Sequence, residues 1–393
     1  RDAKRPPREN VLSPNRPTAD GPGPAAGGAP PEREGDPRPG RSLLSSRAFQ
    51  AAISILLAAV LVWFFLSRVD LRAIGASIAS ASPGWLAAGA LLGLMTFVMR
   101  ALRWIWLLRP VARVPFFPSF TATAVGFAAN MVLPARIGEV VRPALLARRR
   151  GLPFSAALAS VLFERILDMA SVIFFLVLAV LEGPPEGTSD PRPFRALVPA
   201  AIAAGAALVV LSALALMIVF RRAAADRLME RLFRLLPHRL RGKAATVAGT
   251  FFDGFESLRS GRLFTLVVLS SLAMWLVINL QIYCVLRALH LPLPLSAAYV
   301  AVAAAVIGLA VPTPGGIGGY HFAVQSALTG IYGVPLAGAS AAAVLAHASS
   351  FVPITLLGFA LFAMTGMRRE KIGEIVKGSD EPRKSESGMG NRE

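Results

Sequence analysis

Long apolar runs dominate the chain, and short polar connections separate them. Six of these runs are expected to form membrane helices: 48–66, 85–99, 155–181, 196–220, 263–286 and 337–364. Several reach the roughly 20 residues that an α-helix needs to cross the hydrocarbon core of a bilayer. The pattern predicts an all-α polytopic membrane protein.

A further apolar stretch, 116–150, is interrupted by the polar segment NMVLPARIGEVVR at 130–142. Arg113 precedes the stretch and three consecutive arginines follow at 148–150. Basic residues favour the cytoplasmic face, so one full crossing would leave one flank on the wrong side. We therefore predict a broken or re-entrant element that enters the membrane and returns at 130–138. Backbone of this kind must be covered by protein or line a water-filled cavity.

A second interruption, AVPTPGGIGGYH at 310–321, divides another apolar stretch into two short halves. Two short crossings and one hairpin from the outer face both satisfy the charge pattern. The chain is thus expected to have about eight membrane-embedded helices, including two broken or re-entrant segments. The interruptions fall in corresponding places of the two halves of the chain, as in transporters built from repeats. An inverted repeat is a hypothesis that follows from this pattern.

Composition supports the membrane class, and charge placement sets an orientation. The chain is 54% hydrophobic and 16% charged, with a net charge of +18, whereas roughly 25% of residues in a soluble domain are charged. Most Lys and Arg residues lie in the segments 1–47, 100–150, 221–262 and 367–393. This bias predicts a multi-pass protein of the cell inner (plasma) membrane with cytoplasmic N- and C-termini. Nucleic acid is excluded as a partner, because no soluble basic domain remains.

The sequence divides into three parts. Residues 1–46 are rich in proline and poor in large apolar residues, so we expect a disordered cytoplasmic arm. Residues 47–366 form the transmembrane domain, and 367–393 are expected to be a disordered cytoplasmic tail. Within 221–262, leucines and arginines recur at helical spacing. This spacing favours either a basic amphipathic helix on the anionic inner leaflet or the solvated face of a cytoplasmic hairpin.

Polar and charged residues gather around the first interruption and on the run after it. They are Asn130, Arg136, Glu139, Arg142, Glu164, Arg165 and Asp168. A charge at a helix centre costs about 2.5–3.5 kcal/mol on insertion scales, so the last three must face protein, one another or water. One interpretation is an ion-pair network that joins Arg165 to Asp168, and Glu164 to Arg136 or Arg142. The other is a substrate site, in which an unpaired Arg136 or Arg142 holds the phosphate of a phospholipid headgroup.

Two more arginines, Arg100 and Arg103, follow the run 85–99 in the segment MRALRWIWLLR. We expect their long side chains to extend toward the lipid headgroups. Trp104 and Trp106 beside them are typical of the membrane–water interface.

The second interruption has a different chemistry. Its glycines permit sharp turns, and a helix that begins near Gly319 would direct the positive end of its dipole to an anion. His321 and His347 lie in an apolar context, where a lone histidine is more often a packing residue than a proton carrier. Four histidines in the whole chain make no metal cluster, and no nucleotide-binding P-loop is present. We therefore expect no metal and no cofactor.

Three motifs in order resemble the transmembrane flippase domain of lysylphosphatidylglycerol synthases: NMVLPARIGEVVRPALL, ERILDMA and VPTPGGIGGYHFAV. The resemblance covers about residues 48–366. It implies an inner-membrane protein with broken helices around a lipid-accessible cavity. It also implies binding or translocation of a lipid, which is aminoacylated phosphatidylglycerol in the best-known members. The positions that match the family's motifs are Asn130, Pro134, Arg136, Gly138, Glu139, Arg142, Glu164, Arg165, Asp168, Pro314, Gly315, Gly316 and Gly318.

Two departures from the family bear on the substrate. Many members have a glutamate where this chain has His321, so selection of a cationic headgroup does not carry over. His321 is nevertheless a candidate substrate-binding residue because of its place beside the glycines. The soluble aminoacyl-transferase domain has no counterpart in the sequence, so we do not expect this chain to make lysylphosphatidylglycerol.

The favoured function is non-enzymatic: binding and translocation of a phospholipid or lipid-linked substrate. One alternative is a membrane-embedded transferase that uses Glu139, Glu164 or Asp168 as acid, base or metal ligand. Another is an accessory membrane subunit whose terminal arms recruit partners. The sequence does not indicate an oligomeric state.

Overall fold

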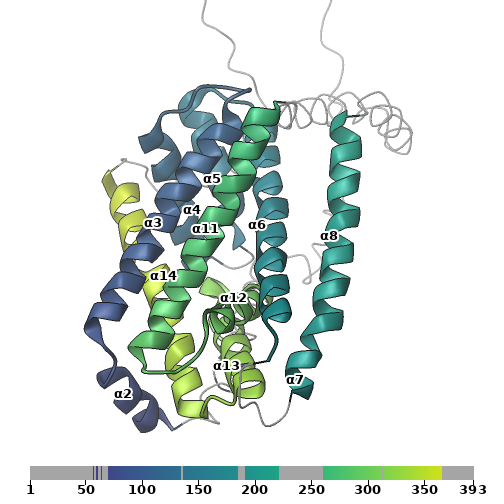
Figure 1. The fold of residues 1–393 in the computed structure, drawn as a ribbon. Helices are drawn as coiled ribbons and strands as arrows, with labels where there is room; N and C mark the ends of the chain where they lie inside the picture. Colours follow the sequence, from purple (N-terminus) through teal and green to yellow (C-terminus); the bar gives the residue numbers. More distant parts are fainter. Residues whose placement is uncertain are drawn as a thin grey trace, which may run out of the picture. The chain divides into compact units, whose positions relative to one another are not determined.

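A computed structural model of the chain describes residues 56, 59–60, 63, 70–133, 136–184, 191–220, 260–311 and 313–364. The regular structure in these residues is helical, which confirms the all-α prediction (Figure 1). The helices are α2 (Leu71–Ala79), α3 (Pro83–Leu108), α4 (Phe116–Val132), α5 (Gly138–Arg150), α6 (Phe154–Glu182), α7 (Arg192–Arg195), α8 (Leu197–Phe220), α11 (Gly261–Ala288), α12 (Leu295–Leu309), the 3₁₀ turn η4 (Pro314–Gly316), α13 (Gly319–Tyr332) and α14 (Leu336–Met364).

The chain divides into two compact units, Arg1–Ser42 and Leu43–Glu393, and the described residues belong to the second. Several predictions fall almost wholly outside the described residues. They concern the first span, both terminal arms and the basic segment: 48–66, 1–46, 367–393 and 221–262.

Several described helices confirm a multi-pass membrane protein. Four segments are long and apolar enough to cross a membrane: α3, Arg192–Val210, α11 and α14. α6 is equally long, with 29 residues, but carries Glu164, Arg165 and Asp168 in its first half. A helix of this length extends about 43 Å, more than the hydrocarbon thickness. If α6 crosses the bilayer, residues ten to fourteen positions from its start fall within the hydrocarbon core, and we infer this depth for the three charged residues.

α4 and α5 form the first re-entrant element, which we call hairpin 1. With 17 and 13 residues, neither helix is long enough to cross the membrane. They run antiparallel in close contact, since Gly126 faces Arg142. Gly138 lies against Asn130 and the Gly126 carbonyl oxygen, and a Cβ atom at Gly138 would overlap that oxygen. The predicted reversal of the chain at 130–138 is confirmed.

α12, η4 and α13 form a second re-entrant element, hairpin 2. Gly308 and Gly319 pack backbone to backbone, so the two short helices run antiparallel side by side. The second interruption is therefore one hairpin and not two separate crossings. Gly318 at its tip has a φ of 90°, a conformation that favours glycine.

The two hairpins enter from opposite ends of the helix bundle, and their tips meet. α3 and α11 run antiparallel, because the Ser82 N–H at the start of α3 donates to the Ala288 carbonyl at the end of α11. Hairpin 1 follows the end of α3 and hairpin 2 follows the end of α11 (Figure 1). At the tips, Gly315 packs against the Met131 side chain.

The order of elements is that of an inverted repeat. α3, hairpin 1 and α6 form one half, and α11, hairpin 2 and α14 form the other. The contacts between the halves are reciprocal, since α4 packs on α14 while α12 packs on α6. The topology thus agrees with the hypothesis raised by the two interruptions.

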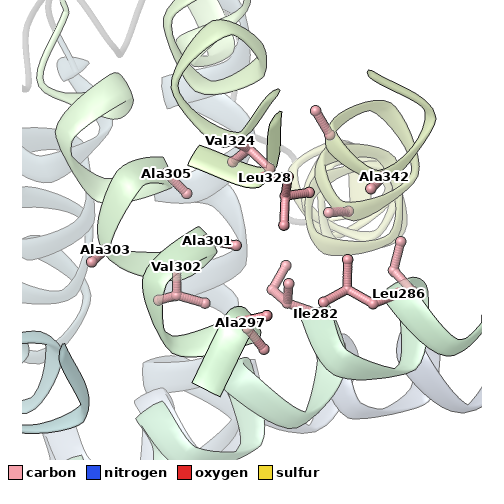
Figure 2. Close-up of a cluster of buried hydrophobic side chains, with 14 of the residues drawn as sticks. Ile282, Leu286, Ala297, Ala301, Val302, Ala303, Ala305, Val324, Leu328 and Ala342 are labelled. Carbon is pink, nitrogen blue, oxygen red and sulfur yellow. The ribbon is translucent and has the colours of Figure 1, made fainter. Parts of the chain in front are cut away.

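A large apolar core holds the second half together (Figure 2). Ala297 and Ala301 of α12 pack with Ile282 and Leu286 of α11 and with Leu328 of α13. Small side chains let the helices approach closely, which is how helices associate in a membrane. Hairpin 2 is therefore held mainly by packing.

Candidate functional site

Charged residues of α3, hairpin 1 and α6 form one group, which we call the charged cluster. Its members are Arg100, Arg103, Arg136, Glu139, Arg142, Glu164, Arg165 and Asp168. Glu164 and Asp168 are four residues apart and share a face of α6, as their spacing predicts. Hairpin 1 contributes residues from its tip and from the first turns of α5.

Asp168 is the most enclosed carboxylate of the charged cluster, with 0% of the residue exposed. Its oxygens lie 2.8 Å from Nη1 of Arg103, 3.3 Å from Nη1 of Arg165 and 3.5 Å from Nη1 of Arg100. The Trp275 Nε1–H of α11 also donates to it, at 2.9 Å. The predicted pairing of Arg165 with Asp168 is confirmed, but Asp168 also binds α3 and α11.

Glu164 is almost as buried as Asp168 and pairs with hairpin 1. Its Oε2 lies 2.6 Å from Nη1 of Arg142, and its Oε1 lies 3.6 Å from Nε of Arg103. The Arg142 guanidinium is 3.9 Å from the ring centroid of Trp104, a cation–π arrangement. Of the two predicted partners for Glu164, the structure shows Arg142. The Arg142 guanidinium is therefore occupied by protein groups.

The accessible side of the charged cluster is formed by Arg136, Glu139 and Arg165. Glu139 lies 3.8 Å from Arg136 and 3.4 Å from Arg165. The exposed fractions of the side chains are 43% for Arg136 and 31% for Arg165. Arg136 has a positive φ of 53° at the break between the helices. These two guanidinium groups are the accessible ones in the cluster.

The prediction that Arg100 and Arg103 extend to the lipid headgroups is wrong. Both are buried, and Arg103 also donates to the Ser271 hydroxyl at 2.9 Å. The reason is that α3 continues to Leu108, beyond the end of the apolar run. The arginines therefore lie more than one turn inside the helix. A signal was available, because Arg100 and Arg103 share a helix face with Gly93.

The charged cluster contains more positive than negative groups. Among the described residues it joins five arginines to three carboxylates. Several buried donors have no hydrogen-bond partner in the structure, including Nε of Arg100 and of Arg142. The site therefore has the charge and the donors to receive an anion.

The candidate residues of hairpin 2 form a separate group around its tip. Pro314, Gly315 and Gly316 make the 3₁₀ turn, and the Gly315 carbonyl oxygen lies 2.9 Å from Nε2 of His347. The ring centroids of His321 and His347 are 4.8 Å apart. Hairpin 2 reaches hairpin 1 through Gly315 and Met131.

Asn130 lies near the end of α4, toward the tip of hairpin 1. The Asn130 Oδ1 is buried and has no hydrogen-bond partner in the structure. Pro134 lies outside the described residues. In the part of the chain that is described, no group of three His, Cys, Asp or Glu residues could hold a metal ion.

The sequence matches a known family over most of its length. Residues 51–358 match the family described as the lysylphosphatidylglycerol synthase TM region. The chain belongs to this family. The resemblance noted in the three motifs is thereby confirmed.

The matched residues include every candidate residue and both halves of the inverted repeat except the last turns of α14. The chain is also similar to "Glycosyltransferase AglD" of Haloferax volcanii, with 26% identity over 298 residues. That similarity covers 69% of this chain and 47% of the relative. The chain thus spans about half the length of the curated relative it matches.

Proposed function

We propose that the protein binds a phospholipid or lipid-linked substrate and translocates it across the inner membrane, with both termini in the cytoplasm. The observation that carries the proposal is the excess of arginines in the charged cluster, at membrane depth beside the meeting hairpin tips. A charge at that depth costs several kcal/mol unless a group of opposite charge pairs with it. An anionic headgroup would supply that partner.

The accessible arginines would contact the headgroup phosphate. Arg136 and Arg165 are partly exposed, and a guanidinium presents a planar fork of donors that suits a phosphate. Arg142 and Arg103 would hold the frame, because Glu164 and Asp168 already engage them. The acyl chains would remain in the surrounding lipid.

The remaining candidates would complete the binding path. Asn130 lies on the hairpin 1 side, and the glycine turn with His321 lies on the hairpin 2 side; Pro134, outside the described residues, is proposed from the family motif. Two re-entrant elements whose tips meet would let a headgroup pass between them while the long helices remain in place. Broken helices at a repeat interface are the common site of substrate binding in transporters.

A membrane-embedded transferase is the second candidate, because the Haloferax relative is named a glycosyltransferase. Glu139 would be the acid or base, since it is the most exposed carboxylate of the cluster. Incubation of the purified protein with lipid-linked sugars tests this activity. A transferred sugar would favour the transferase over the transporter.

Reconstitution into liposomes tests the proposal. Wild-type protein should move a labelled phospholipid between leaflets faster than empty vesicles do. A charge-assisted hydrogen bond contributes about 1.5–3 kcal/mol, so Arg136→Ala should slow this movement about tenfold or more. Arg150→Ala is the matched control, because Arg150 is an exposed arginine at the other end of α5. Equal rates for empty vesicles, wild type and Arg136→Ala would contradict transport.

A further inference from the structure

His347 occupies a place on α14 that corresponds to the carboxylates of α6. Glu164 and Asp168 lie ten and fourteen residues after the start of α6, and His347 lies eleven after the start of α14. Arg103 and Gln281 correspond in the same way, each twenty residues after the start of α3 or α11. The second half of the inverted repeat therefore has neutral or titratable groups where the first half has charged ones.

The His347 ring is enclosed by the tip of hairpin 2 and by aromatic rings. The residue is 7% exposed, and its Nε2 lies 2.9 Å from the Gly315 carbonyl oxygen. A carbonyl oxygen only accepts, so Nε2 carries the hydrogen and Nδ1 is the basic nitrogen. The ring centroids of His321, Tyr320 and Phe351 lie 4.7 to 4.9 Å away.

Acidic residues are missing from the helices around His347. In the described structure α4, α12, η4, α13 and α14 contain no Asp, Glu, Lys or Arg. α3 contributes Arg100 and Arg103, which both pair with Asp168. The other charged or titratable groups on the helices that pack on α13 or α14 are Arg72, Arg192, Arg195, Arg262, Arg287, Tyr283, Tyr299, Tyr332 and Cys284. Asp70, at the start of α2, accepts the Arg72 N–H. Within the described residues, the helices packed around His347 therefore offer an imidazolium no carboxylate partner, and an anionic headgroup could supply one.

We propose that His347, with His321 beside it, is a proton-binding site that lets the second half hold an anionic headgroup. Without the proton the pair is neutral. One proton from water on Nδ1 gives an imidazolium, which can pair with a phosphate as the arginines of the first half do. The like charge disfavours a second proton on a ring 4.8 Å away, so the pair takes only one.

This inference rests on the proposed function and adds a condition to it. The charged cluster can accept an anionic headgroup at any physiological pH, because arginine stays protonated. The second half can accept it only together with a proton. Passage of an anionic headgroup from hairpin 1 to hairpin 2 would therefore be coupled to protonation.

Binding of labelled phosphatidylglycerol to the purified full-length protein tests the proton site, at about pH 5 and about pH 8, because a buried imidazole takes a proton only at lower pH than an exposed one. Wild-type protein should bind one more lipid at the lower pH. His347→Gln should lose this increment and keep the binding seen at the higher pH, which also shows that the variant is folded. Glutamine can still donate to the Gly315 carbonyl but takes no proton. His290→Asn is the control, since His290 contacts the Ser80 carbonyl at an exposed site.

The outcomes separate the two proposals. Equal binding by wild type at both pH values would overturn the proton site and leave lipid binding by the charged cluster standing. The proton site is likewise overturned if His347→Gln still binds the additional lipid at the lower pH. It is also overturned if phosphatidylcholine, whose headgroup is neutral overall, shows the same additional binding. No binding of phosphatidylglycerol at either pH would overturn the proposed function together with the proton site.

Discussion

Asp168 is the residue on which the charged cluster depends most. Its carboxylate faces three guanidinium groups and accepts the Trp275 N–H. Asparagine would keep the shape but leave buried arginines without a counter-charge. Removing one partner of a buried ion pair costs about 3–5 kcal/mol, so Asp168→Asn should lower the free energy of unfolding by about that amount. Thermal unfolding in detergent would show the loss as a lower midpoint.

The control for this substitution is Glu182→Gln. Glu182 is an exposed carboxylate at the C-terminal end of the same helix, so the unfolding midpoint of this variant should stay near that of wild type. If Asp168→Asn unfolds at the same temperature as Glu182→Gln, the charged cluster does not stabilise the fold.

Single residues of the charged cluster could be predicted where their partners are near in sequence or specified by spacing. Arg165 and Asp168 are such a pair, and Glu164 had two plausible partners, one of which was right. Arg100 and Arg103 could not be assigned in this way. An arginine at the end of an apolar run extends to the headgroups if lipid surrounds it, but turns inward if a carboxylate on another helix is within reach. That choice depends on the contact of α3 with α6, which no local pattern specifies.

At the scale of elements, hairpin 1 depends on the contact between Gly126 and Gly138. A Cβ atom at Gly138 would overlap the Gly126 carbonyl oxygen and crowd the Asn130 side chain. Gly138→Ala should therefore separate α4 from α5 and reduce the yield of folded protein in detergent. Size-exclusion chromatography of a fluorescent fusion measures that yield.

Gly330→Ala provides the comparison, because a Cβ atom at that position in α13 would meet nothing within 4 Å. Alanine is also the better helix former there, so the yield should be unchanged or slightly higher. Equal yields from Gly138→Ala and Gly330→Ala would mean that the α4–α5 contact is not close.

The hairpins were predictable because two independent signals agreed at hairpin 1. Proline and glycine indicated a break, and arginines on both flanks required a return to the same side. At hairpin 2 the flanks carry too little charge, so crossing and returning remained equal alternatives. The backbone contact of Gly308 with Gly319 decides between them, and a glycine alone does not reveal its distant neighbour.

For the whole molecule, the inverted repeat accounts for the position of the site. Two hairpins that enter from opposite ends bring their tips together at Gly315 and Met131. The order of helices and interruptions indicated this symmetry before any contact was known. The difference between the halves could not be predicted, because it depends on which residues of α6 and α14 fall at the same depth.

The central claim is that an anionic headgroup binds beside the charged cluster where the hairpin tips meet. Photocrosslinking tests it most directly, with a phosphatidylglycerol that carries a diazirine next to the headgroup, followed by peptide mapping of the adducts. Adducts should concentrate in 130–142 and 310–321, and Arg136→Ala should reduce them while Arg150→Ala leaves them unchanged. Adducts spread over lipid-facing helices such as α8, with no enrichment in those two segments, would contradict the account.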